Sequence, residues 1–149
     1  MVFITVLIVF IFDQFTKIYV AKTLLLNQSV PIAKGILHFT LVHNRGAAFG
    51  ILKNQVPVFI FTAAVAIALI YLNLKKNKKK GLSLYNFALG LILAGALGNL
   101  VDRLTFGYVI DFIDLRIWPV FNVADSAITA GAILLGWTIL ITKENKSSV

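Results

Sequence analysis

The stretch FNVADSAITAGAILLGWTILI, residues 121–141, joins a short polar opening to a long apolar run. About 20 residues of α-helix cross a hydrocarbon layer of about 30 Å, and this run has that length. Asn122 and Asp125 stand in its first turn, where their side chains can accept hydrogen bonds from the free N–H groups of a helix start. The stretch therefore predicts a capped transmembrane helix.

The composition indicates an integral membrane protein with a single domain. Of the 149 residues, 59% are hydrophobic and 13% are charged, and the mean hydropathy is +0.90. A soluble domain carries about 25% charged residues. There is no cysteine, which excludes disulfides and Cys-ligated metals. We expect one all-α domain over residues 1–149, with four transmembrane helices at about 2–22, 55–74, 82–101 and 122–142.

The basic residues predict that both termini face the cytoplasm. KKNKKKG, residues 75–81, connects the second and third spans, and short lysine-rich connections are typical of the cytoplasmic side. In this orientation the inner side has seven basic residues and Glu144, net +6, and the outer side has seven basic residues and five aspartates, net +2. Because topology explains the lysine run, the overall charge of +8 does not indicate nucleic-acid binding.

The two outer connections have different patterns. Within residues 23–54, the stretch ILHFTLVHN at 36–44 is rich in aromatic and β-branched residues, which favours a strand in a small sheet on the outer surface. Residues 103–121 are too apolar for a solvated loop, and Tyr108 and Trp118 suit the headgroup level. We therefore expect this second connection to lie at the membrane interface.

Five of the six carboxylates are aspartates near the outer ends of the predicted spans: Asp13, Asp102, Asp111, Asp114 and Asp125. A charge at the centre of a membrane helix costs about 2.5–3.5 kcal/mol on insertion scales. Five carboxylates at one depth of an acid-poor chain therefore indicate a shared polar site. Local explanations exist for four of them: ion pairs of Asp13 with Lys17, Asp102 with Arg103 and Asp114 with Arg116, and a capping role for Asp125. Asp111 has no evident local partner.

The same spacing of an amide and a carboxylate occurs twice, in GNLVDR at 98–103 and in FNVADS at 121–126. Asn99 and Asp102 end a predicted helix, whereas Asn122 and Asp125 begin one. Capping explains only the second pair, because Asn-x-x-Asp is not a C-terminal capping pattern. Both pairs can bring an amide and a carboxylate from one helix face to a common site.

The residue inventory favours chemistry by paired carboxylates. There is no HExxH motif, His38 and His43 stand alone on a strand-like stretch, and Ser29 and Ser126 have no matching base. Of two carboxylates about 3 Å apart, one keeps a proton, so the pair can activate a water and protonate a carbonyl oxygen without a metal or cofactor. This predicts aspartic peptide hydrolysis. The alternatives are a small proton-coupled transporter or channel subunit, with the aspartates as a proton relay, and a purely structural membrane subunit.

Five stretches together resemble the signature sequences of the lipoprotein signal peptidases, the type II signal peptidases of bacteria. They are DQFTK (13–17), HNRGAAFG (43–50), GALGNLVDR (95–103), YVIDFID (108–114) and FNVADSA (121–127). The resemblance implies a four-helix bundle in the bacterial cytoplasmic (inner) membrane, with its active site towards the extracytoplasmic side. It also implies a small β-sheet cradle over that site, for which residues 28–50 are suited.

The resemblance further implies an aspartic endopeptidase that needs no cofactor. Its substrate would be a prolipoprotein whose lipobox cysteine carries diacylglycerol, and cleavage on the N-terminal side of that cysteine would release the signal peptide. Such an enzyme works among membrane lipids and is inhibited by cyclic peptide antibiotics such as globomycin.

Carried over residue by residue, the resemblance assigns the catalytic pair to Asp111 and Asp125. Asp102 is the competing candidate, and we expect it to have a supporting role through Arg103. The stretch between Asp111 and Asp125 is short for the family, so the shape of this connection is not predicted. The other positions that match the family pattern are expected to line the site and hold the substrate backbone or an inhibitor: Asp13, Asn44, Asn99, Arg103 and Asn122.

Overall fold

The computed structural model describes residues 2–46, 54–76 and 83–147, and it describes side chains as far as residue 141. In chain order the elements are α1 (Val2–Thr23), β1 (Ser29–Ala33), β2 (Leu37–Asn44), α2 (Val56–Lys76), α3 (Leu84–Phe106), β3 (Val109–Asp114) and α4 (Val123–Ser147). The last residues of the expected cradle, 47–50, and the lysines at 78–80 lie outside these residues, as do the side chains of Lys143, Glu144 and Lys146.

All four helices of the described chain are long and apolar enough to cross a membrane, which confirms the four predicted spans. The third span differs in length, because α3 continues past residue 101 to Phe106. It ends where Gly107 adopts a left-handed conformation (φ 75°) and donates its N–H to the carbonyl of Arg103. The helix begins at Ser83, whose hydroxyl accepts a hydrogen bond from the N–H of Asn86 at 3.2 Å.

The helix α3 lies at the centre of the bundle and packs against α1, α2 and α4. Small residues permit this packing, because a side chain would separate the helices. A Cβ added at Gly95 would collide with the carbonyl oxygen of Ala124 in α4, and one at Gly90 would lie 3.4 Å from Thr5 in α1. The helix α2, in contrast, buries none of its residues and leaves its surface for lipid.

The three strands form an antiparallel sheet in the order β1-β2-β3. The strand expected within residues 36–44 is confirmed as β2, and β1 confirms the small sheet expected nearby. Residues 109–114, part of the stretch expected at the membrane interface, form β3, a strand that was not predicted; it pairs with β2 and is mostly buried. The apolar character of these residues therefore includes packing inside the protein, and only the distant partner strand identifies it.

Side chains alternate along β3, so Ile110 and Phe112 lie on one face of the sheet and Asp111 on the other. Ile110 and Phe112 pack with Val20 and Leu41 in a hydrophobic core between the sheet and α1. Because successive side chains of a strand point to opposite faces, Asp111 points away from that core. It points into the polar cluster described below.

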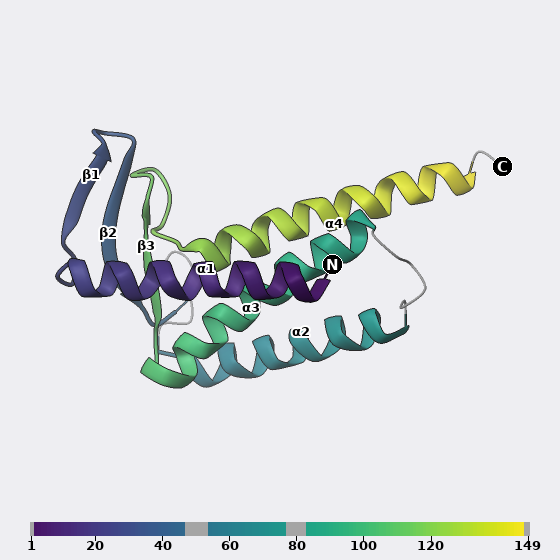
Figure 1. Ribbon diagram of the computed structural model, residues 1–149, viewed down its shortest axis with the longest axis horizontal. Helices are drawn as coiled ribbons and strands as arrows, with labels where there is room; N and C mark the ends of the chain where they lie inside the picture. Colours follow the sequence, from purple (N-terminus) through teal and green to yellow (C-terminus); the bar gives the residue numbers. More distant parts are fainter. Residues whose placement is uncertain (1, 47–53, 77–82, 148–149) are drawn as a thin grey trace.

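The sheet covers one end of the bundle (Figure 1). The beginning of α1 and the end of α4 both lie towards the other end, as an even number of spans requires. The C-terminal part of α3 and the N-terminal part of α4 meet near the sheet, so the two Asn-x-x-Asp stretches approach each other there.

Candidate active site

A cluster of buried polar side chains lies where α1, α3, β3 and the start of α4 meet. Burying such groups is unfavourable unless each has hydrogen-bond partners, so their pairing identifies a built site. Asp13, Asp102, Asp111 and Asn122 are each at most 1% exposed. All eight sequence-predicted site residues belong to this cluster or contact it: Asp13, Asn44, Asn99, Asp102, Arg103, Asp111, Asn122 and Asp125.

Asp111 is held by two side-chain amides. Asn44 in β2 donates to its Oδ2 at 2.8 Å, and Asn122 donates to its Oδ1 at 2.6 Å. The register explains the first contact, since Asn44 pairs with Val109 and so lies diagonally across the sheet from Asp111 on the same face. Asp111, which has no local partner in the sequence, is thus held entirely by distant residues.

Asp125 caps its own helix and also faces the cluster. The backbone N–H of Asp125 donates to Oδ1 of Asn122 at 2.8 Å, and the backbone N–H of Asn122 donates to Oδ2 of Asp125 at 3.3 Å. This reciprocal pair confirms the predicted cap. The other carboxylate oxygen accepts a hydrogen bond from Asn99 Nδ2 at 2.7 Å. The cap and the site therefore use the same residue.

The amides of Asn99 and Asn122 connect the two carboxylates. Asn122 Nδ2 donates to Asp111 and also to Asn99 Oδ1, at 3.1 Å. Lys17 Nζ donates to the same oxygen of Asn99 at 3.0 Å. Because an ammonium group can only donate, this contact fixes the orientation of the Asn99 amide, with its Nδ2 towards Asp125.

Lys17 links three parts of the cluster. Besides Asn99, its ammonium group contacts Asp13 Oδ2 and Asp102 Oδ2, both at 2.9 Å, and its side chain is 1% exposed. Three partners match the three N–H donors of the group. The predicted Asp13–Lys17 pair is confirmed, but it is buried and not on the helix surface.

Asp13 and Asp102 each bind the backbone next to one of the two aspartates of the expected pair. Asp13 Oδ1 accepts a hydrogen bond from the N–H of Ala124 at 2.8 Å, and Asp102 Oδ2 accepts one from the N–H of Ile110 at 3.1 Å. Gln14 Nε2 joins them by donating to both carboxylates at 3.1 Å. We call Asp13, Gln14, Lys17 and Asp102 the clamp, because they fix the chain immediately before Asp111 and Asp125.

The local ion pair expected between Asp102 and Arg103 is wrong for the described residues, whereas the supporting role of Asp102 stays a prediction. Asp102 forms its ion pair with Lys17, because successive helix residues point about 100° apart and Asp102 faces α1. Arg103 instead donates from Nη1 to the carbonyl oxygen of Asn99 at 3.3 Å and lies over the ring of Phe59, 4.9 Å from its centroid. It lines a cavity of about 360 Å³ together with Asn44 and Asp125.

Burial makes Asp111 a weak acid. Removal from water raises its pKa from 3.8 to about 7, and the charge of Asp125 acts in the same direction. The hydrogen bonds from Asn44 and Asn122 favour the charged form and oppose this rise. Asp111 is thus poised to hold or release a proton near neutral pH.

The remaining titratable candidates lie in the sheet, away from the clamp. Asp114 pairs with Arg116 at 3.5 Å, as expected, and accepts a hydrogen bond from Thr40 at 2.6 Å. His43 stacks on Tyr108, with ring centroids 3.9 Å apart, and His38 contacts Arg116. Within the described residues, no group of three or more His, Asp or Glu side chains is arranged to hold a metal ion.

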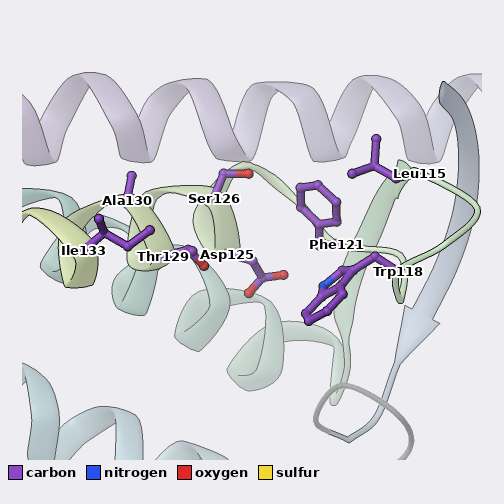
Figure 2. Close-up of a pocket in the computed structure, with 8 residues that line it drawn as sticks. All are labelled: Leu115, Trp118, Phe121, Asp125, Ser126, Thr129, Ala130 and Ile133. Atoms are coloured by element: carbon purple, nitrogen blue, oxygen red, sulfur yellow. The ribbon is translucent and has the colours of Figure 1, made fainter. Parts of the chain in front are cut away.

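A second cavity, of about 480 Å³, also has Asp125 in its lining. Figure 2 shows Asp125 between α4 side chains and the rings of Phe121 and Trp118, which come from the segment joining β3 to α4. The candidate site therefore opens into two hollows that share Asp125.

Sequence reasoning missed Lys17 and Gln14 as members of the site. Lys17 was considered only as a surface partner of Asp13, although a lysine inside an apolar span is itself a signal, because an unpaired charge there is expensive. Gln14 gives a weaker form of the same signal, since it lies three residues before Lys17 in the same span and a neutral amide there also needs a partner.

Comparison with known proteins identifies the family. A family model described as signal peptidase (SPase) II matches residues 5–141. The lipoprotein signal peptidase of Halothermothrix orenii is 48% identical over 135 residues, which cover 91% of this chain and 92% of that protein. That of Caldanaerobacter subterraneus subsp. tengcongensis is 49% identical over 142 residues, 94% and 96% of the two chains. A bacterial membrane enzyme solved by the in meso method superposes with a TM-score of 0.91 at 35% identity, covering 97% of this chain and 90% of that one. The chain belongs to the signal peptidase II family, whose members remove signal peptides from prolipoproteins.

Proposed function

We propose that this membrane peptidase is an aspartic endopeptidase in which Asp111 and Asp125 form the catalytic pair. The observation that carries the proposal is the binding of both carboxylates by one residue, Asn122, although they come from different elements. The charge of Asp125 also raises the pKa of Asp111, which supports a shared role of the two carboxylates in proton transfer. The clamp supports this role, because it fixes the backbone just before each aspartate.

The two carboxylates divide the proton transfers. Asp111 holds the proton at neutral pH, in keeping with its pKa of about 7. Asp125 takes a proton from a water, and the water oxygen attacks the carbonyl carbon of the scissile peptide bond. Asp111 donates its proton to the carbonyl oxygen. When the tetrahedral intermediate collapses, the proton on Asp125 passes to the leaving amine, and the hydroxyl proton returns to Asp111.

The other site residues hold the substrate and the pair. Asn44 and Arg103 line the more polar cavity beside Asp125, where their N–H groups can bind peptide carbonyls of the substrate or of a globomycin-type cyclic peptide. Asn99 and Asn122 orient the carboxylates. Asp13 and Asp102 support the pair through the clamp.

The substrate we propose is a prolipoprotein whose lipobox cysteine carries diacylglycerol, cut on the N-terminal side of that cysteine. The lipid stays in the bilayer and holds the scissile bond near the headgroups. The cluster lies at the sheet end of the bundle, where the helices leave the membrane. We place this end on the extracytoplasmic side of the bacterial inner membrane and both termini in the cytoplasm, because of the lysine run at 75–80.

The test is cleavage of a purified, diacylglyceryl-modified preprotein in detergent, with and without EDTA, followed by mass spectrometry of both products. The wild type is expected to release the signal peptide in both conditions. Asp111→Asn and Asp125→Asn should each lose activity while remaining folded. Asp114→Asn is the matched control, since its carboxylate lies in the sheet away from the pair.

Different outcomes contradict different parts of the proposal. Near-normal turnover by Asp111→Asn or by Asp125→Asn rules out the pair. If Asp102→Asn is inactive while Asp111→Asn is active, Asp102 replaces Asp111 in it. The proton-coupled transporter is set aside, because the described carboxylates of the site are joined in one cluster through Lys17, Asn99 and Asn122 and form no relay across the bundle. A proton flux in proteoliposomes would restore that alternative.

A further inference from the structure

A third cavity lies between α1 and α2, at the end of the bundle opposite the sheet. Both helices pack on α3 far more than on each other, so a space remains between them. The start of α1 and the end of α2, which bound this space, lie away from the sheet in Figure 1. Its volume is about 330 Å³, within the range of about 300–1,000 Å³ that is typical of pockets for small ligands. We call it the α1–α2 cavity. Its lining consists of Val2, Phe3, Val6, Tyr71, Leu74, Lys75 and Leu93.

The interior of the α1–α2 cavity is apolar and open to the membrane. Leu93 lies nine residues after the start of α3, so at 1.5 Å per residue the lining reaches about 14 Å along the bundle. Phe3 and Tyr71, on the two sides of the cavity, are both exposed, and α1 and α2 are membrane spans. An acyl chain can therefore enter from the side without leaving the bilayer. A peptide backbone there would leave its N–H and C=O groups without partners, which is unfavourable.

The mouth of the α1–α2 cavity carries a positive charge. Lys75 is the last residue but one of α2, and Tyr71 lies one turn before it on the same helix face. Among the described side chains, no carboxylate forms an ion pair with Lys75. A phosphate diester can supply the missing negative charge, and the Tyr71 hydroxyl can donate to a phosphate or ester oxygen. Basic pockets between membrane helices on the cytoplasmic side bind anionic lipid headgroups in this way.

We propose that the α1–α2 cavity binds an anionic glycerophospholipid, with one acyl chain inside the cavity and the phosphate at Lys75. The site goes beyond the proposed function, because none of its lining residues belongs to the candidate active site or the clamp. Charge disfavours two other occupants. A signal peptide has a positively charged n-region, and a second copy of this chain would bring another Lys75 to the same surface. Each would place a cation beside Lys75, whereas the lipid places an anion there.

Native mass spectrometry of the purified protein tests the proposal, in titrations with dioleoyl phosphatidylglycerol or dioleoyl phosphatidylcholine. Lys75→Gln removes the charge, and because Lys75 is exposed this change disturbs no packing. Lys76→Gln is its matched control, since Lys76 is also exposed but points about 100° away around α2 and does not line the cavity. Val6→Phe fills the apolar interior. Leu7→Phe is its control, because Leu7 is exposed on another face of α1 and does not line the cavity.

The wild type is expected to bind one phosphatidylglycerol with a Kd about fivefold below that of phosphatidylcholine, in keeping with about 1 kcal/mol for one lysine near a membrane surface. Lys75→Gln should remove this preference, and Lys76→Gln should keep it. Val6→Phe should weaken the binding of both lipids by about tenfold or more, since each methylene group kept out of the cavity lowers affinity about fourfold. Leu7→Phe should leave both affinities unchanged.

Several outcomes would overturn the inference. Equal affinity of the wild type for the two lipids removes the role of the charge. An equal loss in Lys75→Gln and Lys76→Gln shows attraction to the whole basic surface and not to the cavity. Unchanged binding by Val6→Phe places the lipid elsewhere. The same spectra detect the other occupants: a dimer that disappears in Val6→Phe assigns the cavity to a second copy of the chain. Displacement of phosphatidylglycerol by a synthetic signal peptide in the wild type assigns it to the substrate.

Discussion

Lys17→Met replaces a buried cation of the clamp with an apolar side chain of similar length. The ammonium group has three short contacts, at 2.9, 2.9 and 3.0 Å, and 1% of the side chain is exposed. Removing one partner of a buried ion pair leaves an uncompensated charge and costs about 3–5 kcal/mol. Here two carboxylates, Asp13 and Asp102, lose their cation together.

Other donors reduce the loss expected from Lys17→Met. Asp13 keeps hydrogen bonds from Ala124 N at 2.8 Å and Gln14 at 3.1 Å, and Asp102 keeps those from Ile110 N and Gln14, both at 3.1 Å. We therefore expect the lower end of the range, a decrease of about 3 kcal/mol in the free energy of unfolding. Activity should fall as well, because the amide of Asn99 loses the contact that orients it towards Asp125.

Reversible unfolding in mixed dodecyl maltoside and SDS micelles, followed by tryptophan fluorescence, measures this free energy. Lys22→Met is the control, since Lys22 is exposed near the end of the same helix and should change stability by less than about 0.5 kcal/mol. In the double variant Lys17→Met, Asp102→Asn only Asp13 is left unpaired, so the two changes should be non-additive by about 1–3 kcal/mol. A loss below about 1 kcal/mol for Lys17→Met, or strict additivity, would refute the reasoning.

Three further predictions concern the pair and its support. Cleavage should decline above a pH of about 7, because Asp111 then loses the proton that it donates; a pH profile of kcat that stays flat to pH 9 would contradict this. Because the pKa of Asp111 is raised, the folded state holds a proton on Asp111 between about pH 4 and 7 that the unfolded state lacks. The wild type therefore loses stability as pH rises through that window, whereas Asp111→Asn does not. Measured by unfolding titrations, the stability of Asp111→Asn relative to wild type should improve by up to about 4 kcal/mol from pH 4 to 8. Gly98→Ala should destabilise the protein by about 1–3 kcal/mol, since its Cβ would lie 2.5 Å from Asp13 Oδ2, whereas Gly136→Ala, with no atom within 4 Å, should stabilise it slightly in the same assay.

Local sequence patterns predicted most of the fold. Hydropathy and length predicted all four spans, because each membrane helix satisfies its own backbone hydrogen bonds and needs only about 20 apolar residues. The cap at Asn122 and Asp125 and the ion pair of Asp13 with Lys17 were likewise predictable, since both join residues three or four apart in one helix. The eight site residues came from short sequence signatures, and the structure places them together.

The partners of these residues required the tertiary structure. Asp102 was assigned to its neighbour Arg103, but it pairs with Lys17, which belongs to another helix. Residues 109–114 were not predicted as a strand, but they form β3 and are buried against β2. Their apolar sequence is compatible with both the membrane interface and a protein core, so only the partner strand identifies them as part of the sheet.

The sequence by itself determined that this chain is a four-span membrane protein with five of its six carboxylates near one end, since hydropathy and charge act locally along a helix. Only the tertiary structure decided which carboxylates share Asn122 and which belong to the clamp. The decisive contacts join residues 82 positions apart, from Lys17 to Asn99, and 111 apart, from Asp13 to Ala124. No periodicity of a helix or a strand extends over such distances, and packing of the folded helices selects them.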